Sequence, residues 1–189
     1  MVFSGFLFPQ FLIMLQTLKK QFFAHRNGML AQQLKAAGDP HTIIMGCQLV
    51  DIVAITSLYG KDSQLAQALW NEKQHRECRM AATMLYPVEE FTVNNALEWC
   101  NDLESTEIAD VLCHRLLRHL NYAPQLWEKM LKSEQPLSHY AAWRLLLNLL
   151  LMSKIENPTN LVSSIDKELQ SASQSLRPIL ESIREECLL

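Results

Sequence analysis

Turn-forming residues divide this sequence into short stretches, and this division limits what the chain can fold into. Seven segments are rich in Gly, Pro, Asn, Asp and Ser, which favour turns: 36–41, 59–63, 86–90, 101–106, 121–124, 133–136 and 156–160. Between them, apolar residues recur with the period of an amphipathic helix. Proline stands where four helices would begin, a position that tolerates it: Pro87, Pro124, Pro136 and Pro158. The pattern predicts helices near 10–36, 46–58, 63–71, 74–85, 88–101, 105–120, 124–132, 136–153, 159–171 and 174–187.

The residue composition favours helices over strands. The chain has 32 Leu against 7 Val, and only 5 Gly; Leu is a strong helix former, whereas β-branched residues favour strands. Short connections between successive helices imply antiparallel neighbours. A weak internal echo places Leu-Trp on one helix and Arg on an apolar following helix, at Trp70 and Arg79 and again at Trp127 and Arg144. We therefore predict an all-α fold, an α-α superhelix of HEAT-like antiparallel helix pairs, with a compact irregular bundle as the main alternative.

The length and the terminal residues bear on domain organisation. With 189 residues, 49% of them hydrophobic, the chain can bury a core as one domain, which we place at 14–189. The apolar start MVFSGFLFPQFLIM is shorter than the roughly 20 residues of a membrane span and lacks the basic flank of a signal peptide. Residues 1–13 are either part of the fold or an extension outside it, with Met14 as a second possible start. No membrane association is expected.

Five cysteines without a C-x-x-C pair predict buried free thiols and a reducing compartment, so we expect a cytoplasmic protein. The sequence has no Gly-rich phosphate loop, no H-E-x-x-H, no G-x-S-x-G and no cluster with metal-ligand spacing. We therefore expect neither a cofactor nor a metal ion. Because the net charge is -3, binding to nucleic acid requires a local basic face.

Two stretches are candidates for such a face. On the predicted helix 74–85, Arg76 and Arg79 lie one turn apart, opposite an apolar stripe. In DVLCHRLLRHL (110–120), one arc of about 140° at 100° per residue carries His114, Arg115, Arg118 and His119. Either face alone is ordinary solvated surface. Two of them on neighbouring hairpins of a solenoid favour a concave binding wall.

Three segments resemble the DNA alkylation repair enzymes (the AlkD-like DNA glycosylases). DSQLAQALWNEKQHRECRMAATMLYP is similar to the segment in which a Leu-Trp helix precedes an Arg-Glu-x-Arg helix. ALEWCNDLESTEIADVLCHRLL is similar to the segment with the catalytic carboxylate, and HYAAWRLLLNLL to the next hairpin. The resemblance covers roughly residues 28–153. It implies a HEAT-like superhelix whose concave basic face holds duplex DNA, and hydrolysis of the N-glycosidic bond of alkylated purines without a metal ion.

The resemblance also implies roles for single residues. Asp110 falls on the catalytic Asp of the family, and Arg144 falls on its DNA-facing Arg. Thr106 stands where the family has an aromatic residue, Glu107 replaces the first carboxylate of the motif, and no aromatic residue follows Trp143. Excision of a cationic base relies on a carboxylate and on aromatic faces. The active site is therefore expected to be degenerate.

Tyr140, one turn before Arg144, is the best remaining candidate for an aromatic wall. Asp110 alternatively pairs with His114, one turn along the same helix. Three hypotheses follow: a glycosylase with Asp110 as its carboxylate, a catalytically silent DNA-binding relative, or a HEAT-like scaffold for a protein partner. The first two imply duplex DNA, possibly alkylated, as the partner of a monomer. The residues expected to contact DNA are Arg76, Arg79, Arg115, Arg118, Tyr140 and Arg144.

Overall fold

The computed structural model describes residues 7–189, with side chains from residue 12 onward. Within this part of the chain there are eleven α-helices and three short 3-10 helices, and no strand beyond one isolated bridge between Ile43 and His75. The prediction of an all-α fold is confirmed. Two compact units, Met1–Glu90 and Phe91–Leu189, are described separately below. The assignment of 14–189 to a single domain stays a prediction.

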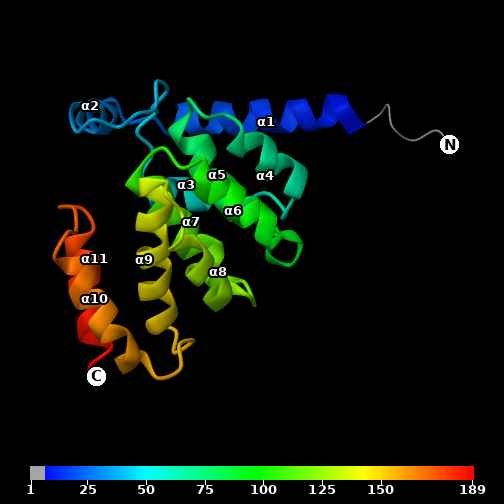
Figure 1. Cartoon of the computed structure of the whole chain (residues 1–189). Coiled ribbons are helices and arrows are strands. Elements are labelled where there is room, and N and C mark those ends of the chain that lie inside the picture. The colour runs from blue at the N-terminus through cyan, green and yellow to red at the C-terminus, as the bar shows by residue number, and fades with distance from the viewer. Residues whose placement is uncertain (1–6) are drawn as a thin grey trace. The chain divides into compact units, whose positions relative to one another are not determined.

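The N-terminal unit contains five α-helices and one 3-10 helix (Figure 1). Its core is formed where α4 packs on α5 and α3 packs on both α5 and α1. Phe22, Ile52, Leu65 and Trp70 are among the side chains that fill it. The bounds are α1 (Leu7–Ala24), α2 (Gly28–Ala36), α3 (Leu49–Ser57), α4 (Ser63–Trp70), α5 (Arg76–Leu85) and η1 (Val88–Glu90).

The single helix predicted near 10–36 is in fact two helices. Asn27 interrupts it with an extended backbone, and its side chain accepts a hydrogen bond from the Leu30 N–H, which makes it the N-cap of α2. The Asn27 N–H donates to the carbonyl of Met45 at 2.9 Å, so the break is held by a distant loop. The Asn-Gly pair at 27–28 is a turn signal that the sequence interpretation passed over.

The first helix also bears on the predicted extension 1–13. Residues 1–6 of that extension lie outside the described residues, whereas residues 7–13 form the beginning of α1. In the part of the chain that the structure describes, no helix has both the length and the apolar character needed to cross a bilayer.

Gly46 lies in the loop between α2 and α3 at a point of close backbone approach. Its φ is +75°, and a Cβ atom added there would lie 2.2 Å from the Asn27 carbonyl oxygen. We expect Gly46→Ala to lower the free energy of unfolding by more than about 2 kcal/mol, from the left-handed backbone and the clash together. Urea unfolding measures this. Gly38→Ala is the matched control, since Gly38 has φ +86° but open space around it; equal losses in the two variants would show that the contact with Asn27 contributes nothing.

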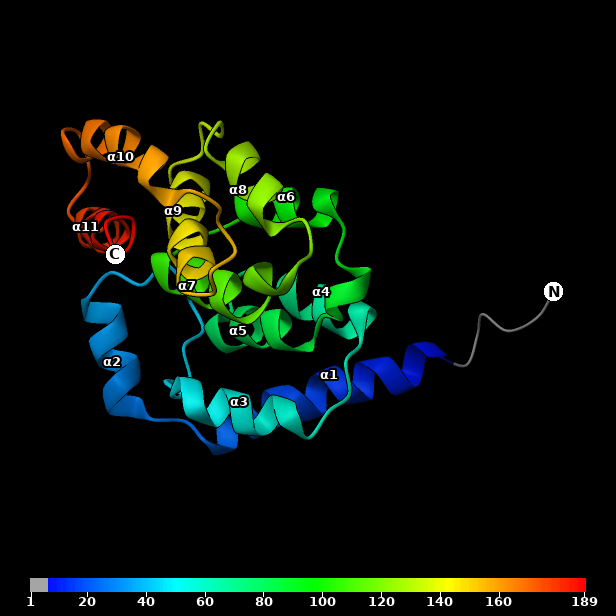
Figure 2. The same cartoon turned by 90° about the horizontal axis from the view of Figure 1, so that it is seen from below.

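The C-terminal unit is built from helices that pack on their second neighbours along the chain. Thus α6 packs on α8, α7 on α9, and α9 on α11, while the consecutive pairs α8–α9 and α10–α11 also pack. Figure 2 shows α10 beside α11, as does Figure 1. This arrangement is that of stacked helical hairpins. The bounds are α6 (Val93–Asn101), α7 (Thr106–Arg115), η2 (Leu117–His119), α8 (Ala123–Met130), α9 (Pro136–Leu150), η3 (Pro158–Leu161), α10 (Val162–Leu169) and α11 (Arg177–Glu186).

Candidate nucleic-acid interface and carboxylate centre

The sequence pattern of α5 predicts an exposed basic face at Arg76 and Arg79, and the structure contradicts this. Arg76 is 3% exposed and Arg79 is fully buried. Both guanidinium groups donate hydrogen bonds to partners inside the N-terminal unit. An arginine in this state cannot reach a phosphate unless the unit opens. The charged residues at the start of α5, Arg76, Glu77 and Arg79, are therefore part of the core and not of the solvated surface.

Glu77, which the sequence interpretation did not single out, is the centre of this buried network. Its carboxylate accepts hydrogen bonds from the backbone N–H groups of Met45, Gly46 and Cys47, at 3.2, 2.9 and 3.3 Å. Arg76 donates to it at 3.0 Å and to the Cys47 carbonyl at 3.1 Å. Burial alone would raise the pKa of Glu77, but the hydrogen bonds from His75 and Met45 and the charge of Arg76 lower it to about 2. The network joins α5 to the loop before α3.

Arg79 has a separate role, against Trp70 at the end of α4. Its guanidinium carbon lies 3.6 Å from the centroid of the indole ring, and Nη1 donates to the Trp70 carbonyl oxygen at 2.7 Å. A cation over an aromatic face is stabilised by the ring quadrupole, and more strongly so when both groups are desolvated. This contact fixes the packing of α4 on α5. Trp70 is 2% exposed and is therefore a core residue.

The second predicted basic face, at 110–120, does not lie on a single helix but on α7 and η2. α7 ends at Arg115, and Leu116 has φ -127° and ψ -62°, which interrupts the helix before η2. Arg118 and His119 therefore lie on a 3-10 turn. Arg118 donates from Nε to the His119 Nε2 at 3.3 Å, and its carbonyl accepts a hydrogen bond from the Lys154 side chain at 2.7 Å. These contacts hold the turn in place.

We call His114, Arg115, Arg118 and His119 the basic patch. Burial lowers the pKa of His114, and the charges of Arg118, Arg115 and Arg144 lower it further. This effect shows that the cationic groups lie close to one another in spite of the break in the helix. In the part of the chain that the structure describes, neither Arg115 nor Arg118 is paired with a carboxylate. These two arginines therefore carry positive charge that no described carboxylate neutralises.

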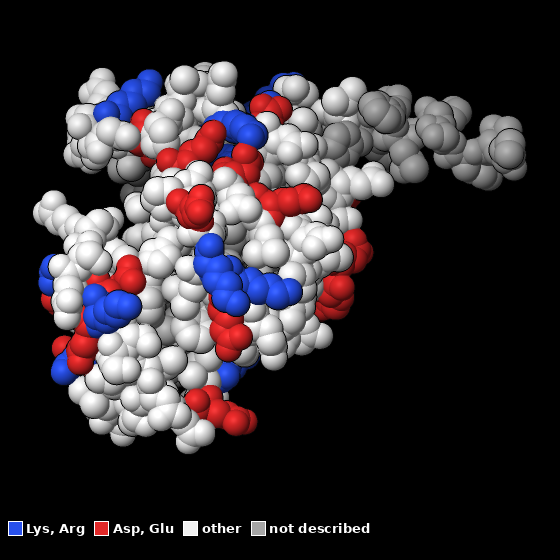
Figure 3. Space-filling model, in the orientation of Figure 1, with Lys and Arg blue, Asp and Glu red and all other residues white. Residues whose placement is uncertain are grey.

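On the face shown in Figure 3, acidic and basic side chains are interspersed, in keeping with the net charge of -3. Long-range attraction of the whole protein to a polyanion is therefore weak, and binding to nucleic acid depends on local contacts.

Asp110, Tyr140 and Arg144 come together in the C-terminal unit, and we call them the Asp110 centre. The Tyr140 hydroxyl donates to Asp110 Oδ1 at 3.0 Å, and Arg144 Nε lies 3.2 Å from the same oxygen. Asp110 projects from α7, and the other two project from successive turns of α9, which packs on α7. The side chain of Asp110 is 37% exposed and that of Arg144 is 31% exposed. Asp110 is thus paired with Arg144 and Tyr140, and the alternative of pairing with His114 is wrong.

The environment of Asp110 sets the protonation states at this centre. Burial raises the pKa of Asp110, and Glu107 raises it further, whereas the charge of Arg144 and the Tyr140 hydrogen bond lower it. Burial and the Asp110 charge raise the pKa of Tyr140 well above its ordinary value, so the phenol keeps its proton and remains the donor. Both partners contact Oδ1. The arrangement provides a fixed, half-exposed carboxylate.

A pocket of about 360 Å³ adjoins this centre, and we call it the α9–α10 pocket. Tyr140 lines it, and so do His139, one residue earlier on α9, and Glu168 at the end of α10. His139 Nε2 lies 2.9 Å from Glu168 Oε1 and 3.1 Å from Trp143 Nε1. Thr106, at the first position of α7, forms part of the wall. His139 and Glu168 were missed in the sequence, because they are far apart along the chain and belong to no motif.

Comparison with known proteins gives the family. Residues 18–177 match the family described as DNA alkylation repair enzyme. The chain belongs to this family. No curated protein matches it. One solved structure does, with a TM-score of 0.78 and 12% identity, over 89% of this chain and 73% of the other; it is described as one of a new family of proteins related to the HEAT-like repeat DNA glycosylases with affinity for branched DNA structures. At this identity the match shows the fold, so the HEAT-like prediction is confirmed.

The Asp110 centre brings together residues to which the sequence interpretation gave roles. The residues that the resemblance places on the family's carboxylate and DNA-facing arginine, Asp110 and Arg144, are in contact in the structure. Tyr140, expected as an aromatic wall, contacts the same carboxylate. Thr106 stands where the family has an aromatic residue, and Thr106 lines the α9–α10 pocket.

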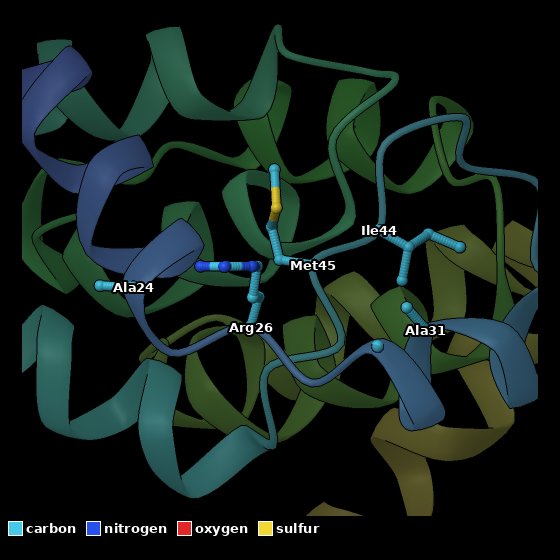
Figure 4. Close-up of a pocket in the computed structure, with 6 residues that line it drawn as sticks. Ala24, Arg26, Ala31, Ile44 and Met45 are labelled. Atoms are coloured by element: carbon cyan, nitrogen blue, oxygen red, sulfur yellow. The ribbon is translucent and has the colours of Figure 1, made fainter.

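Other parts of the chain offer less chemistry. A second pocket, of about 440 Å³, lies between the end of α1, the start of α2 and the loop before α3 (Figure 4). Arg26 is the one titratable residue in its lining, and its guanidinium group lies over the ring of Phe23 and donates to the Phe23 carbonyl. Among residues 7–189 no group of three or more His, Cys, Asp or Glu side chains could hold a metal ion. All five cysteines are buried and free.

Proposed function

We propose that this member of the DNA alkylation repair enzyme family binds DNA through the basic patch. The observation that carries the proposal is that Arg115 and Arg118 are half-buried cations not paired with any carboxylate of the described residues. Such groups bind phosphates well, because little competing hydration or internal pairing has to be released. Lys154, held on the Arg118 carbonyl, adds a further positive charge beside them.

The structural neighbour has affinity for branched DNA structures. We propose the same preference here, because the total charge is low and the patch is small. A branch point brings phosphates of different strands close to one local cationic surface, whereas a plain duplex presents them along a line. The test is fluorescence anisotropy with a four-way junction and a matched linear duplex over a series of salt concentrations. Binding through phosphates weakens steeply as salt increases. A HEAT-like scaffold for protein partners would show no such binding.

His114 makes this binding sensitive to pH. Its lowered pKa leaves it mostly neutral near pH 7, and a phosphate placed on the patch offsets the arginine charges and raises that pKa. Binding is therefore coupled to proton uptake, so affinity rises as the pH falls from 7.5 to 6, by less than about tenfold per pH unit for one proton. His114→Gln should weaken this dependence, and His25→Gln, at an exposed histidine of the N-terminal unit, should keep it in full. A dependence unchanged in His114→Gln would assign the proton elsewhere.

A second candidate function is excision of alkylated purines at the Asp110 centre, favoured by the half-exposed carboxylate beside a pocket. A carboxylate held in place stabilises the cationic sugar that develops as the N-glycosidic bond breaks. Arg144 reduces this effect because it neutralises Asp110, and Thr106 provides no aromatic face for a cationic base. We expect excision to be feeble.

Base release from methylated duplex DNA measures this activity against a blank and an active family member. Asp110→Asn is expected to lower whatever rate the wild type shows by roughly 30- to 1000-fold, equivalent to about 2–4 kcal/mol of transition-state stabilisation. Asp166→Asn, at an exposed ion pair with Arg184, serves as the control. Robust release that persists in Asp110→Asn would mean that another residue supplies the carboxylate.

A further inference from the structure

The α9–α10 pocket has a lining unlike that of a phosphate site. Its walls come from the start of α7, the first turns of α9, the end of α10 and the segment before α11, all within the C-terminal unit. No Lys or Arg is among the described residues that line it, whereas two carboxylates, Glu134 and Glu168, are. A phosphate would be repelled here. The favoured ligand is neutral or cationic and donates hydrogen bonds.

The hydrogen bonds around His139 leave the Glu168 carboxylate able to accept from a ligand. The Trp143 indole N–H can only donate, so it requires the lone pair of His139 Nε2 at 3.1 Å. Glu168 Oε1, 2.9 Å from the same nitrogen, requires a proton on it. One nitrogen of a neutral imidazole cannot satisfy both. When Trp143 takes the lone pair, the carboxylate of Glu168 faces the pocket without a donor from His139.

The remaining walls suit a flat, partly apolar ligand. Leu137, Leu176 and the ring of Tyr140 provide apolar surface, and Thr106 and four serines add hydroxyl groups. The volume of about 360 Å³ is within the range of roughly 300–1,000 Å³ found for small-molecule sites. The hydroxyl of Tyr140 points to Asp110 while its ring lines the pocket, so a ligand here lies next to the Asp110 centre.

We propose that the α9–α10 pocket receives an unpaired nucleobase whose exocyclic amino group donates to Glu168. If the base belongs to a DNA strand, this proposal rests on the proposed DNA binding by the basic patch. Binding of a free nucleoside does not depend on the patch. A base has two apolar faces and a polar edge, which match the apolar walls and the carboxylate acceptors of the pocket. Bases displaced from their pairs occur at branch points, so the pocket would add to the preference for such DNA.

The first arm of the test uses fluorescence anisotropy with a hairpin duplex that carries one unpaired adenine. The expected affinity is at least about tenfold higher than for the fully paired hairpin. Replacing the unpaired adenine with purine, which lacks the amino group, should remove most of this gain. Thr106→Trp fills the pocket and Glu168→Gln removes the charged acceptor. Both should abolish the gain without changing the affinity for the paired hairpin, and Glu181→Gln on α11 should keep it.

The second arm uses free 2′-deoxyadenosine, followed by ligand-observed NMR with the full chain. Saturable binding of the nucleoside that is lost in Thr106→Trp and Glu168→Gln supports the pocket. If DNA does not bind in the same experiments, the proposed DNA binding fails, and the pocket is a nucleoside site. An amino-dependent gain in the hairpin alone supports a base presented within DNA. Two results together overturn the proposal. The nucleoside does not bind, and the affinity gain of the hairpin with the unpaired adenine is either absent or unchanged by loss of the amino group and by both variants.

Discussion

Glu77→Gln is expected to lower the free energy of unfolding by about 3–5 kcal/mol, the usual loss when one partner of a buried ion pair is removed. The amide cannot neutralise Arg76, which is 3% exposed, and its NH₂ group faces backbone N–H donors that need an acceptor. Those donors belong to the loop 45–47, so the substitution loosens the loop and α5 together. Urea unfolding measures the loss.

The same group controls stability in acid. The pKa of Glu77 falls from an ordinary value of 4.5 to about 2 on folding. A lowered pKa contributes stability that is present above pH 4.5 and lost as the pH falls toward 2. The wild type should therefore lose stability over this window, and Glu77→Gln should lose much less. The control is Glu72→Gln, at a partly exposed ion pair with Lys19, where a change below about 1 kcal/mol is expected. Equal effects of the two substitutions would rule out the buried network as a source of stability.

Arg115→Ala with Arg118→Ala is expected to flatten the salt dependence of DNA binding by about two units of slope, since each phosphate contact contributes about 0.9. Affinity should fall more for the junction than for the duplex, because the branch point brings phosphates of different strands to the basic patch. Anisotropy titrations between low and moderate salt measure both quantities.

Lys167→Ala with Arg177→Ala is the matched control. It removes the same charge from exposed positions of the C-terminal unit, on α10 and α11. Its slope should stay close to that of the wild type. If the two double variants behave alike, the net charge and not the basic patch governs binding, and the proposed interface is wrong. Arg76 is unsuitable for this test, because its substitution would unfold the N-terminal unit.

Much of the fold was predictable, because helix boundaries depend on local chemistry. α9 begins at Pro136, and Pro158 begins η3, as the sequence predicted. Three predicted helices are interrupted in the structure: at Asn27, at Thr92 between η1 and α6, and at Leu116. At Asn27 a local signal was present, but Leu116 carries no turn residue, and nothing in its neighbourhood of the sequence distinguishes it from the helix that precedes it.

The candidate site was predictable in part. The resemblance assigned roles to Asp110 and Arg144, and Tyr140 was expected beside them because it lies one turn before Arg144. The structure brings all three into contact. It gave no indication of His139 or Glu168, which approach each other because α10 packs next to the first turns of α9.

The sequence by itself determined the helices, their apolar faces and the family, because these depend on spacing along the chain. Only the tertiary structure decided which charges are buried. Arg76 and Arg79 have the same helical spacing as many exposed arginines, yet they are core residues, because Glu77 and Trp70 neutralise or cover them. The Glu77 carboxylate is stable there because three N–H groups from a loop about thirty residues earlier converge on it. A charge is tolerated inside a protein only where such partners meet, and that meeting depends on the folded chain.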